Sequence, residues 1–84
     1  MIFWLLQVNS TVNVNGTDVA FDYLNTFYEM ADAIKEAKLL SEDEDVLQVS
    51  VHGWKLNPDG THEILDDERG CVFSYFNKDH REFS

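Results

Sequence analysis

The sequence predicts a single α+β domain in which one helix packs against one face of an antiparallel sheet. One segment, residues 26–40, has apolar residues at helical spacing, whereas five other segments alternate or run apolar as strands do. Turn sequences rich in Asn, Gly, Pro and Asp separate these segments. The expected element order over residues 1–84 is therefore β-β-α-β-β-β.

Residues 2–24 predict a β-hairpin whose turn is Asn15-Gly16, a pair typical of the two-residue type I′ turn. Such a turn pairs Val14 with Thr17 and, further along, Val8 with Tyr23. Because side chains alternate between the two faces of a strand, this register can be checked against hydrophobicity. It gathers the following apolar side chains on one face: Trp4, Leu6, Val8, Val12, Val14, Val19, Phe21 and Tyr23.

The helix is predicted to run from Thr26 to Leu40, with Thr26 and Glu29 forming a capping box at its start. Its interior is rich in Ala, Glu, Lys and Leu and contains no Gly or Pro, so its helix propensity is high. One stripe is expected to face the sheet. It consists of Phe27, Met30, Ala31, Ile34 and Ala37.

Three further strands are expected after the helix. Val46–Leu56 alternates apolar and polar residues, and the change of phase after Gly53 predicts a β-bulge there. The turn at 57–60 contains Pro followed by Asp-Gly and leads into a fourth strand, Thr61–Leu65. Cys71–Phe76 has strand composition and is expected to be the fifth.

The helix returns the chain along the sheet, so the third strand should run parallel to the second and pair antiparallel with the first. The predicted strand order is 2-1-3-4-5, with the helix on one face. A central position for the first strand agrees with Phe3 and Leu5, which make its beginning apolar on both faces. Residues 77–84 are polar and are expected to form a partly disordered tail.

Charge is the most unusual property of the chain. Sixteen acids against six bases give a formal net charge of −10, and residues 42–68 alone carry a net charge of −8. Such a field repels nucleic acid phosphates and anionic membranes but attracts basic protein surfaces. We therefore expect a protein partner with a basic surface and no direct binding to nucleic acid or membranes.

The sequence also suggests where the protein works. Cys71 is the single cysteine, so no internal disulfide forms and no oxidising compartment is required. No stretch approaches the roughly 20 apolar residues of a membrane span, and no signal peptide is apparent at the N-terminus. The expected location is cytoplasmic.

No nucleotide-binding or catalytic motif occurs, and we expect neither an enzyme nor a cofactor. The alternative is a small metal-binding or enzymatic domain that uses His52, His62 and Cys71. Zinc needs three or four ligands, so Glu63 or Asp66 would have to complete such a site. A structural cysteine and ordinary strand-surface histidines explain the same residues more simply.

Two acidic loops and one aromatic residue are the candidate partner-binding elements. The fourth strand should run opposite to the third, which places the 66–70 loop at the end of the sheet where the third strand begins, so we expect the two acidic loops to converge on one edge. Whether Trp54, Tyr75 and Phe76 belong to the core or to an interface stays open. A thin core in a chain of 84 residues also makes a homodimer possible. The candidate residues are Glu42, Asp43, Glu44, Asp45, Trp54, Asp66, Asp67 and Glu68.

In its small size, strong acidity and lack of catalytic motifs, the chain is similar to phage and plasmid proteins that inhibit nucleic-acid-binding host enzymes by presenting DNA-like negative charge. The similarity lies in size and charge and assigns no residue a role. The hypothesis is therefore a non-enzymatic acidic interaction module, of the inhibitor or DNA-mimic kind, that occupies a basic site on its partner.

Overall fold

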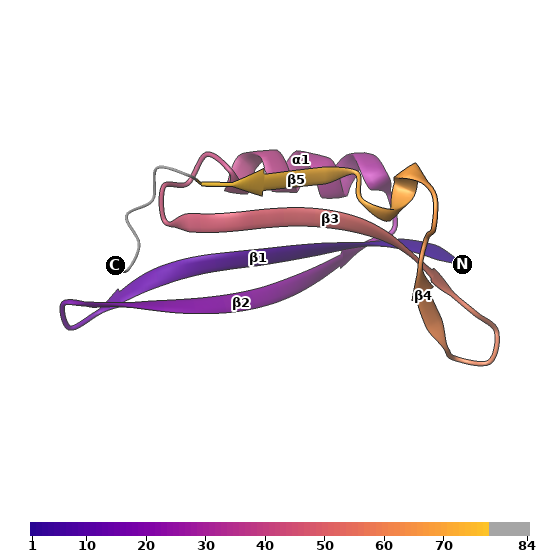
Figure 1. The fold of residues 1–84 in the computed structure, drawn as a ribbon, viewed down its shortest axis with the longest axis horizontal. Coiled ribbons are helices and arrows are strands. Elements are labelled where there is room, and N and C mark those ends of the chain that lie inside the picture. The colour runs from indigo at the N-terminus through magenta and orange to yellow at the C-terminus, as the bar shows by residue number, and fades with distance from the viewer. Residues whose placement is uncertain (78–84) are drawn as a thin grey trace.

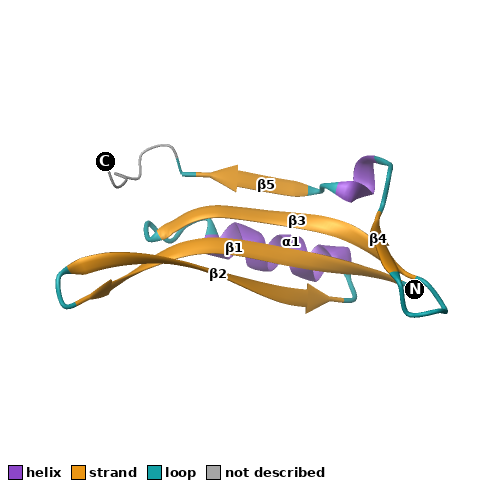
Figure 2. Cartoon of the chain, turned by 60° about the horizontal axis from the view of Figure 1, so that its bottom comes forward, coloured by secondary structure: helices purple, strands orange, loops and turns teal. Residues whose placement is uncertain are grey.

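The computed structural model describes residues 1–77 and confirms the α+β fold class (Figure 1). The helix lies on one face of the sheet, and the opposite face is open (Figure 2). No helix in the described part of the chain is long and apolar enough to cross a membrane. The elements are β1 (Ile2–Val14), β2 (Thr17–Phe27), α1 (Met30–Leu40), β3 (Val46–Leu56), β4 (His62–Ile64), the short 3₁₀ helix η1 (Glu68–Gly70) and β5 (Phe73–Phe76).

The strands follow the order β2-β1-β3-β4, and all pairs are antiparallel. The last strand differs from the sequence-based order, because β5 pairs with β3 and not with β4. The reason is the length of β4, which has three residues and pairs only with Trp54–Leu56. The rest of the same β3 edge stays free, and β5 pairs with Gln48–Val51 there.

The hairpin of β1 and β2 has the predicted register, from Val14 opposite Thr17 to Val8 opposite Tyr23. Asn15 and Gly16 have φ angles of 51° and 86°, as a type I′ turn requires. Asn and Gly adopt positive φ at low cost, so local sequence chemistry explains the turn and hence the register.

The core lies between α1 and the sheet. Its helix side consists of Ala33 and Ala37, whose small side chains let the helix approach the strands closely. Met30 and Ala31, both expected on the buried stripe, are exposed. The predicted stripe was counted from Phe27, but Phe27 is the last residue of β2 and α1 begins only at Met30. The sheet side of the core consists of Trp4, Leu6, Val8, Val46, Val49 and Val51.

The predicted capping box is wrong. Thr26 lies in β2 opposite Leu5, and α1 begins at Met30 with Glu29 at its N-cap. Glu29 makes no side-chain capping hydrogen bond. Pairing with β1 extends β2 through Phe27, so the cross-strand ladder outweighs the local capping signal at Thr26.

The predicted bulge at Gly53 is also wrong. Gly53 pairs in regular register with Trp4, and the irregularity in this strand pair lies at the step from Asn9 to Ser10. Glycine is required at position 53 by close approach, because a Cβ there would lie 2.7 Å from Cζ3 of Trp4 and 2.5 Å from the backbone oxygen of Arg69. With no bulge, Trp54 faces the open side of the sheet.

The turn at 57–60 forms as expected, with Gly60 at φ 92° and its N–H donating to the Asn57 carbonyl over 3.0 Å. Asn77, expected at the start of the polar tail, is tied to β3. Its backbone N–H donates to the Leu47 carbonyl over 2.9 Å. The rest of the predicted tail, residues 78–84, lies outside the described residues.

Candidate functional site

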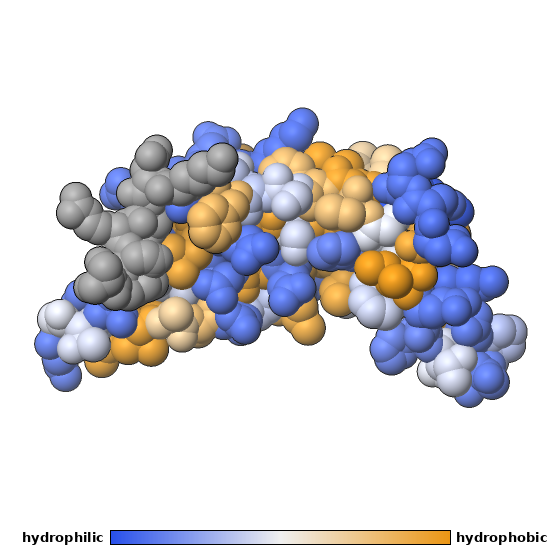
Figure 3. Space-filling view, in the orientation of Figure 1, coloured by the Kyte–Doolittle hydropathy of each residue, from blue (hydrophilic) through white to orange (hydrophobic). Residues whose placement is uncertain are grey.

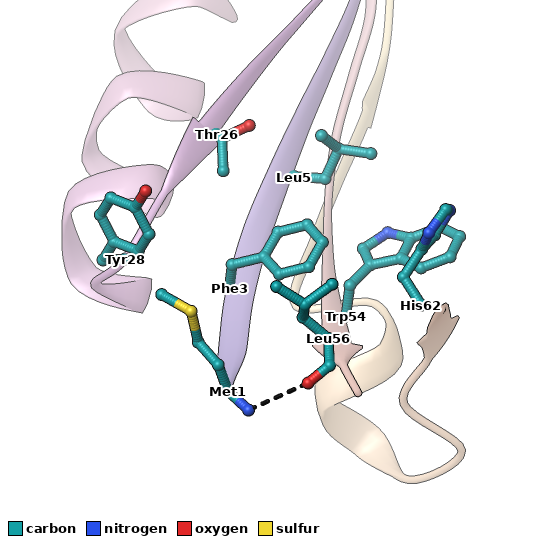
Figure 4. Close-up of a pocket in the computed structure, with 8 residues that line it drawn as sticks. All are labelled: Met1, Phe3, Leu5, Thr26, Tyr28, Trp54, Leu56 and His62. Atoms are coloured by element: carbon teal, nitrogen blue, oxygen red, sulfur yellow. Dashed lines mark hydrogen bonds between the residues drawn. The ribbon is translucent and has the colours of Figure 1, made fainter. Parts of the chain in front are cut away.

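An apolar hollow of about 440 Å³ lies on the open face, at the end of the sheet where β1 begins (Figure 4). Strands β1, β3 and β4 and the end of β2 all contribute to it. Its lining consists of Met1, Phe3, Leu5, Thr26, Tyr28, Trp54, Leu56 and His62.

Strand alternation places these side chains together. Phe3 is opposite Trp54 in the β1–β3 pair, so both side chains point to the face that α1 does not cover. Leu56 is opposite His62 in the β3–β4 pair, which carries the imidazole to the same face. The rings of His62 and Trp54 then lie 5.5 Å apart between centroids, tilted by 54°.

The hydrogen-bonding capacity of Trp54 is not used within the described residues. Its indole Nε1 is buried and has no hydrogen-bond partner among the described residues. Leaving a buried donor unpaired costs about 1–3 kcal/mol. On the rim, the Met1 ammonium donates to the Leu56 carbonyl over 3.1 Å, whereas the Met1 and Tyr28 side chains are 66% and 69% exposed. The hollow therefore combines exposed side chains on its rim with the half-buried aromatic rings of Phe3 and Trp54.

A second, polar hollow of about 240 Å³ lies further along the same face. His52 and Cys71 both line it, but His62 belongs to the apolar hollow. The three residues of the metal-binding alternative are thus divided between two places. Within residues 1–77, no group of three or more His, Cys, Asp or Glu side chains is arranged to hold a metal ion.

The two acidic loops do not converge, contrary to the expectation from the sequence. Glu42–Asp45 lies where β3 begins, and the Asp45 carbonyl accepts from the Thr11 N–H over 3.0 Å. Asp66–Glu68 precedes Arg69, whose backbone oxygen lies beside Gly53. Val46 and Gly53 are seven steps apart along β3, a distance of about 23 Å.

The short length of β4 explains this separation. The chain leaves the sheet part-way along β3 after only three paired residues, so the 66–70 loop never reaches the start of β3. Figure 1 shows the α1–β3 link at one end of the sheet and η1 toward the other. The seven carboxylates of these loops are therefore two separate clusters.

One carboxylate of the second cluster is neutralised locally. Asp67 forms an ion pair with Arg69 over 2.8 Å and also accepts from the Arg69 backbone N–H. The hydrogen bond from the Arg69 side chain, helped by that backbone N–H, lowers the pKa of Asp67 from its ordinary value. In the turn before β4, the Thr61 hydroxyl is the main cause of a lowered Asp59 pKa.

The aromatic candidates separate in the structure. Trp54 lines the apolar hollow, Tyr75 packs against the core under α1, and Phe76 is 62% exposed. Sequence reasoning missed Phe3 and Leu5 as site residues. The signal was present, since β1 begins apolar on both faces, but it indicated a covered strand and not an open hollow.

Comparison of the chain with family models, curated proteins and solved structures finds no match. The functional argument therefore depends on the open-face hollow and on the distribution of charge.

Proposed function

We propose that the protein is a non-enzymatic interaction module that binds a basic protein surface and takes an apolar side chain of that partner into the hollow around Trp54. The observation that carries the proposal is the hollow itself, an apolar cavity lined in part by Trp54. Tryptophan and tyrosine are enriched among the residues that dominate binding energy at protein interfaces.

The lining favours binding over chemistry. Its described residues include the imidazole of His62 but no carboxylate, thiol, lysine or arginine side chain, so it holds few of the groups that commonly act as acid, base or nucleophile. A partner backbone carbonyl brought to this site would offer an acceptor to the Trp54 Nε1, after a small shift of the indole. Such a contact would remove the cost of the unpaired donor.

The charge of the chain favours a basic partner. The described residues contain one ion pair, so nearly all carboxylates are available to an external field. The loops Glu42–Asp45 and Asp66–Glu68 would then act at two points of the partner, mainly by steering its approach. Nucleic-acid-binding proteins present basic surfaces of this kind, and the proposal includes a cytoplasmic inhibitor of the DNA-mimic type, such as a phage or plasmid protein.

The test is selection from a displayed peptide library on the immobilised full chain. We expect enrichment of peptides that combine an aromatic or large aliphatic residue with several Lys or Arg residues. Affinity should fall as salt rises from about 0.05 to 0.5 M, because the Debye length shortens from more than 10 Å to below 5 Å.

A matched pair of variants separates the hollow from the overall charge. Leu56→Lys places an ammonium group at the hollow, whereas Leu39→Lys makes the same change on α1, at a side chain that is 57% exposed. We expect at least a tenfold loss of peptide affinity for the first and less than a twofold change for the second. Equal losses would contradict the hollow as the binding site.

Charge neutralisation tests the electrostatic part. Converting Glu42, Asp43, Asp66 and Asp67 to the corresponding amides should weaken binding and flatten its salt dependence. Binding that is indifferent to both salt and this fourfold change would rule out a role for the acidic loops. Stoichiometric zinc after mild purification would instead support the alternative that uses His52, His62 and Cys71.

A further inference from the structure

The outer half of the β1–β2 hairpin carries an exposed apolar patch on the same face as the core. It continues the buried row of Trp4, Leu6 and Val8, but the hairpin extends past the end of α1 (Figure 1), and Figure 3 shows apolar surface at this end of the molecule. The rings of Phe21 and Tyr23 stack with centroids 6.1 Å apart. The patch consists of Val12, Val14, Val19, Phe21 and Tyr23, each between 37% and 50% exposed.

Strand β2 is also an unprotected sheet edge. It has eleven residues, about twice the mean strand length, and among residues 1–77 it pairs with β1 alone. Exposed edges are commonly blocked by Lys, Pro, a bulge or a very short strand. β2 contains no Lys and no Pro, and its register with β1 is regular throughout.

The two carboxylates of β2 do not guard this edge. Asn9 Nδ2 donates to Asp22 Oδ1 over 2.7 Å, and Asn13 Nδ2 donates to Asp18 Oδ1 over 2.9 Å. Both hydrogen bonds draw the carboxylates toward β1, away from the free side of β2. The edge therefore presents backbone groups without a charged side chain held over them.

The two-residue turn determines which backbone groups face outward. In an antiparallel ladder, the groups of successive residues point alternately to the partner strand and away from it. Counting from the pair Val14–Thr17 that closes the turn, the N–H and C=O groups of Ala20, Asp22 and Leu24 point to the free edge.

We propose that β2 of a second copy of this chain pairs antiparallel with this edge, so that the two copies form one continuous sheet. The pairing is isologous and has a twofold axis through Phe21. It places Phe21 beside Phe21 of the second copy and Val19 beside its Tyr23. The two helices then lie on the same face of the joined sheet.

Charge explains why the occupant is a second copy. The patch contains no ionisable side chain except the Tyr23 phenol, so two chains of net charge −10 can pair there provided that the Asp18 and Asp22 carboxylates of β2 do not lie directly opposite each other. In the register centred on Phe21, Asp22 lies opposite Ala20 and Asp18 lies opposite Leu24. A shift that centres the pairing on Asp22 would place two carboxylates directly opposite each other, which is unfavourable.

This pairing is independent of the open-face hollow and responds to salt in the opposite direction. Two acidic chains repel each other over distance, and salt screens that repulsion. Self-association should therefore strengthen as salt rises, whereas binding of a basic partner should weaken. The failure of one proposal thus leaves the other unaffected.

Sedimentation of the full chain over a range of protein concentrations, at about 0.05 and 0.5 M salt, is the test. We expect a monomer–dimer equilibrium whose dimer fraction is larger at high salt. Phe21→Lys should raise the dimer Kd about tenfold or more, because like charges would meet at the twofold axis. The control Phe76→Lys makes the same change at the opposite side of the sheet and should alter the dimer Kd less than twofold.

Three further measurements identify the edge and the register. Ala20→Pro removes an outward N–H that β1 does not use and should abolish the dimer while retaining the fold. Ala20→Lys should strengthen the dimer, since the new ammonium group would lie opposite Asp22 of the second copy. Amide hydrogen exchange of the unmodified chain should slow at Ala20, Asp22 and Leu24 as concentration rises, a readout that needs no variant.

Two results would overturn the proposal. One is a chain that stays monomeric at every concentration and salt level, which would leave the patch to another protein or to residues 78–84. The other is dimerisation that Phe21→Lys and Phe76→Lys weaken equally, with no concentration-dependent protection of the β2 amides.

Discussion

The two edges of this sheet are built differently. One edge is β2, a continuous strand of eleven residues with a regular register, whose free side pairs with no other strand among residues 1–77. The other is the far side of β3, which β4 and β5 cover with three and four residues. The comparison teaches that the β3 side is protected by short strands and by contacts of the connecting loop, whereas the β2 side depends on the hairpin alone.

The contacts of the β3 side are specific to its residues. The Leu65 N–H donates to the Gly53 carbonyl over 2.9 Å, and the Val72 N–H donates to the Val51 carbonyl over 3.0 Å. These hydrogen bonds hold the loop between β4 and β5 against β3. Substitutions on this side should therefore disturb packing, whereas substitutions on the free side of β2 should be tolerated.

The largest expected effect is at Gly53. Gly53→Ala places a Cβ against the Arg69 backbone oxygen and the Trp4 ring, and overpacking of this kind costs about 1–3 kcal/mol. On the other edge, Ala20→Val enlarges an exposed side chain and should change stability by less than about 0.5 kcal/mol. Urea denaturation measures both. Similar losses would show that the two edges are equally constrained.

The next effect concerns the turn that holds β2 in place. Gly16→Val introduces a β-branched residue at a φ of 86° and should destabilise the chain by about 1 kcal/mol or more. A Cβ at this position meets no other atom within 4 Å, so the cost is conformational and not steric crowding by neighbours. An unchanged melting temperature would mean that the stability of the β1–β2 hairpin does not depend on its turn.

A smaller effect is expected at the helix start that follows β2. On the β3 side, Asp67 caps η1 by accepting from the Arg69 N–H, whereas Glu29 leaves α1 without a side-chain cap. Glu29 has extended backbone angles suited to an N-cap, so Glu29→Asp should stabilise the chain by about 0.5–1 kcal/mol. Thr26→Ala, within β2, should change stability by less than about 0.5 kcal/mol. If urea unfolding showed a larger stability change for Thr26→Ala than for Glu29→Asp, Thr26 would be the capping residue after all.

The smallest effect is the response of the β3 side to acid. Asp59 and Asp67 have pKa values below the ordinary 3.8, lowered mainly by hydrogen bonds from the side chains of Thr61 and Arg69. A carboxyl whose pKa is lower in the folded state adds stability above its unfolded pKa and loses it as the pH falls through the folded pKa. Stability should therefore decline below about pH 4, where unfolded carboxyls begin to protonate.

The matching variant is Asp59→Asn combined with Asp67→Asn. It should be less stable than the original chain at pH 7 and lose less stability between pH 4 and pH 2. Thermal unfolding followed by circular dichroism over this range measures the difference. Parallel pH curves for the two proteins would show that these hydrogen bonds add no stability.

Local signals in the sequence were sufficient for the turns, the hairpin register and the end of α1. Asn15-Gly16 has one favourable turn geometry, and from that turn the register follows by counting. The bounds of β3 were also predictable, because its apolar alternation ends at the Pro turn. In each case the decisive interactions are between residues close in sequence.

The start of α1 and the role of Gly53 were not predictable in this way. Thr26 has a good local signal for a cap, but β1, more than twenty residues away, pairs with it as a strand. The sequence around Gly53 predicted a β-bulge, but glycine is required there because the Trp4 ring and the Arg69 backbone leave no room for a Cβ. Neither contact has a signature in the neighbouring residues.

The sequence by itself determined the fold class, the turns, the excess of negative charge and which side chains of the β1–β2 hairpin share a face. Only the tertiary structure decided which apolar residues are covered, because α1 is shorter than the hairpin and shields one half of one face. That is why Val8 is fully buried and Val12, four residues further along the same row, is 48% exposed. It also decided that the acidic loops lie apart, since β4 pairs with only three residues at the end of β3 before the chain leaves the sheet.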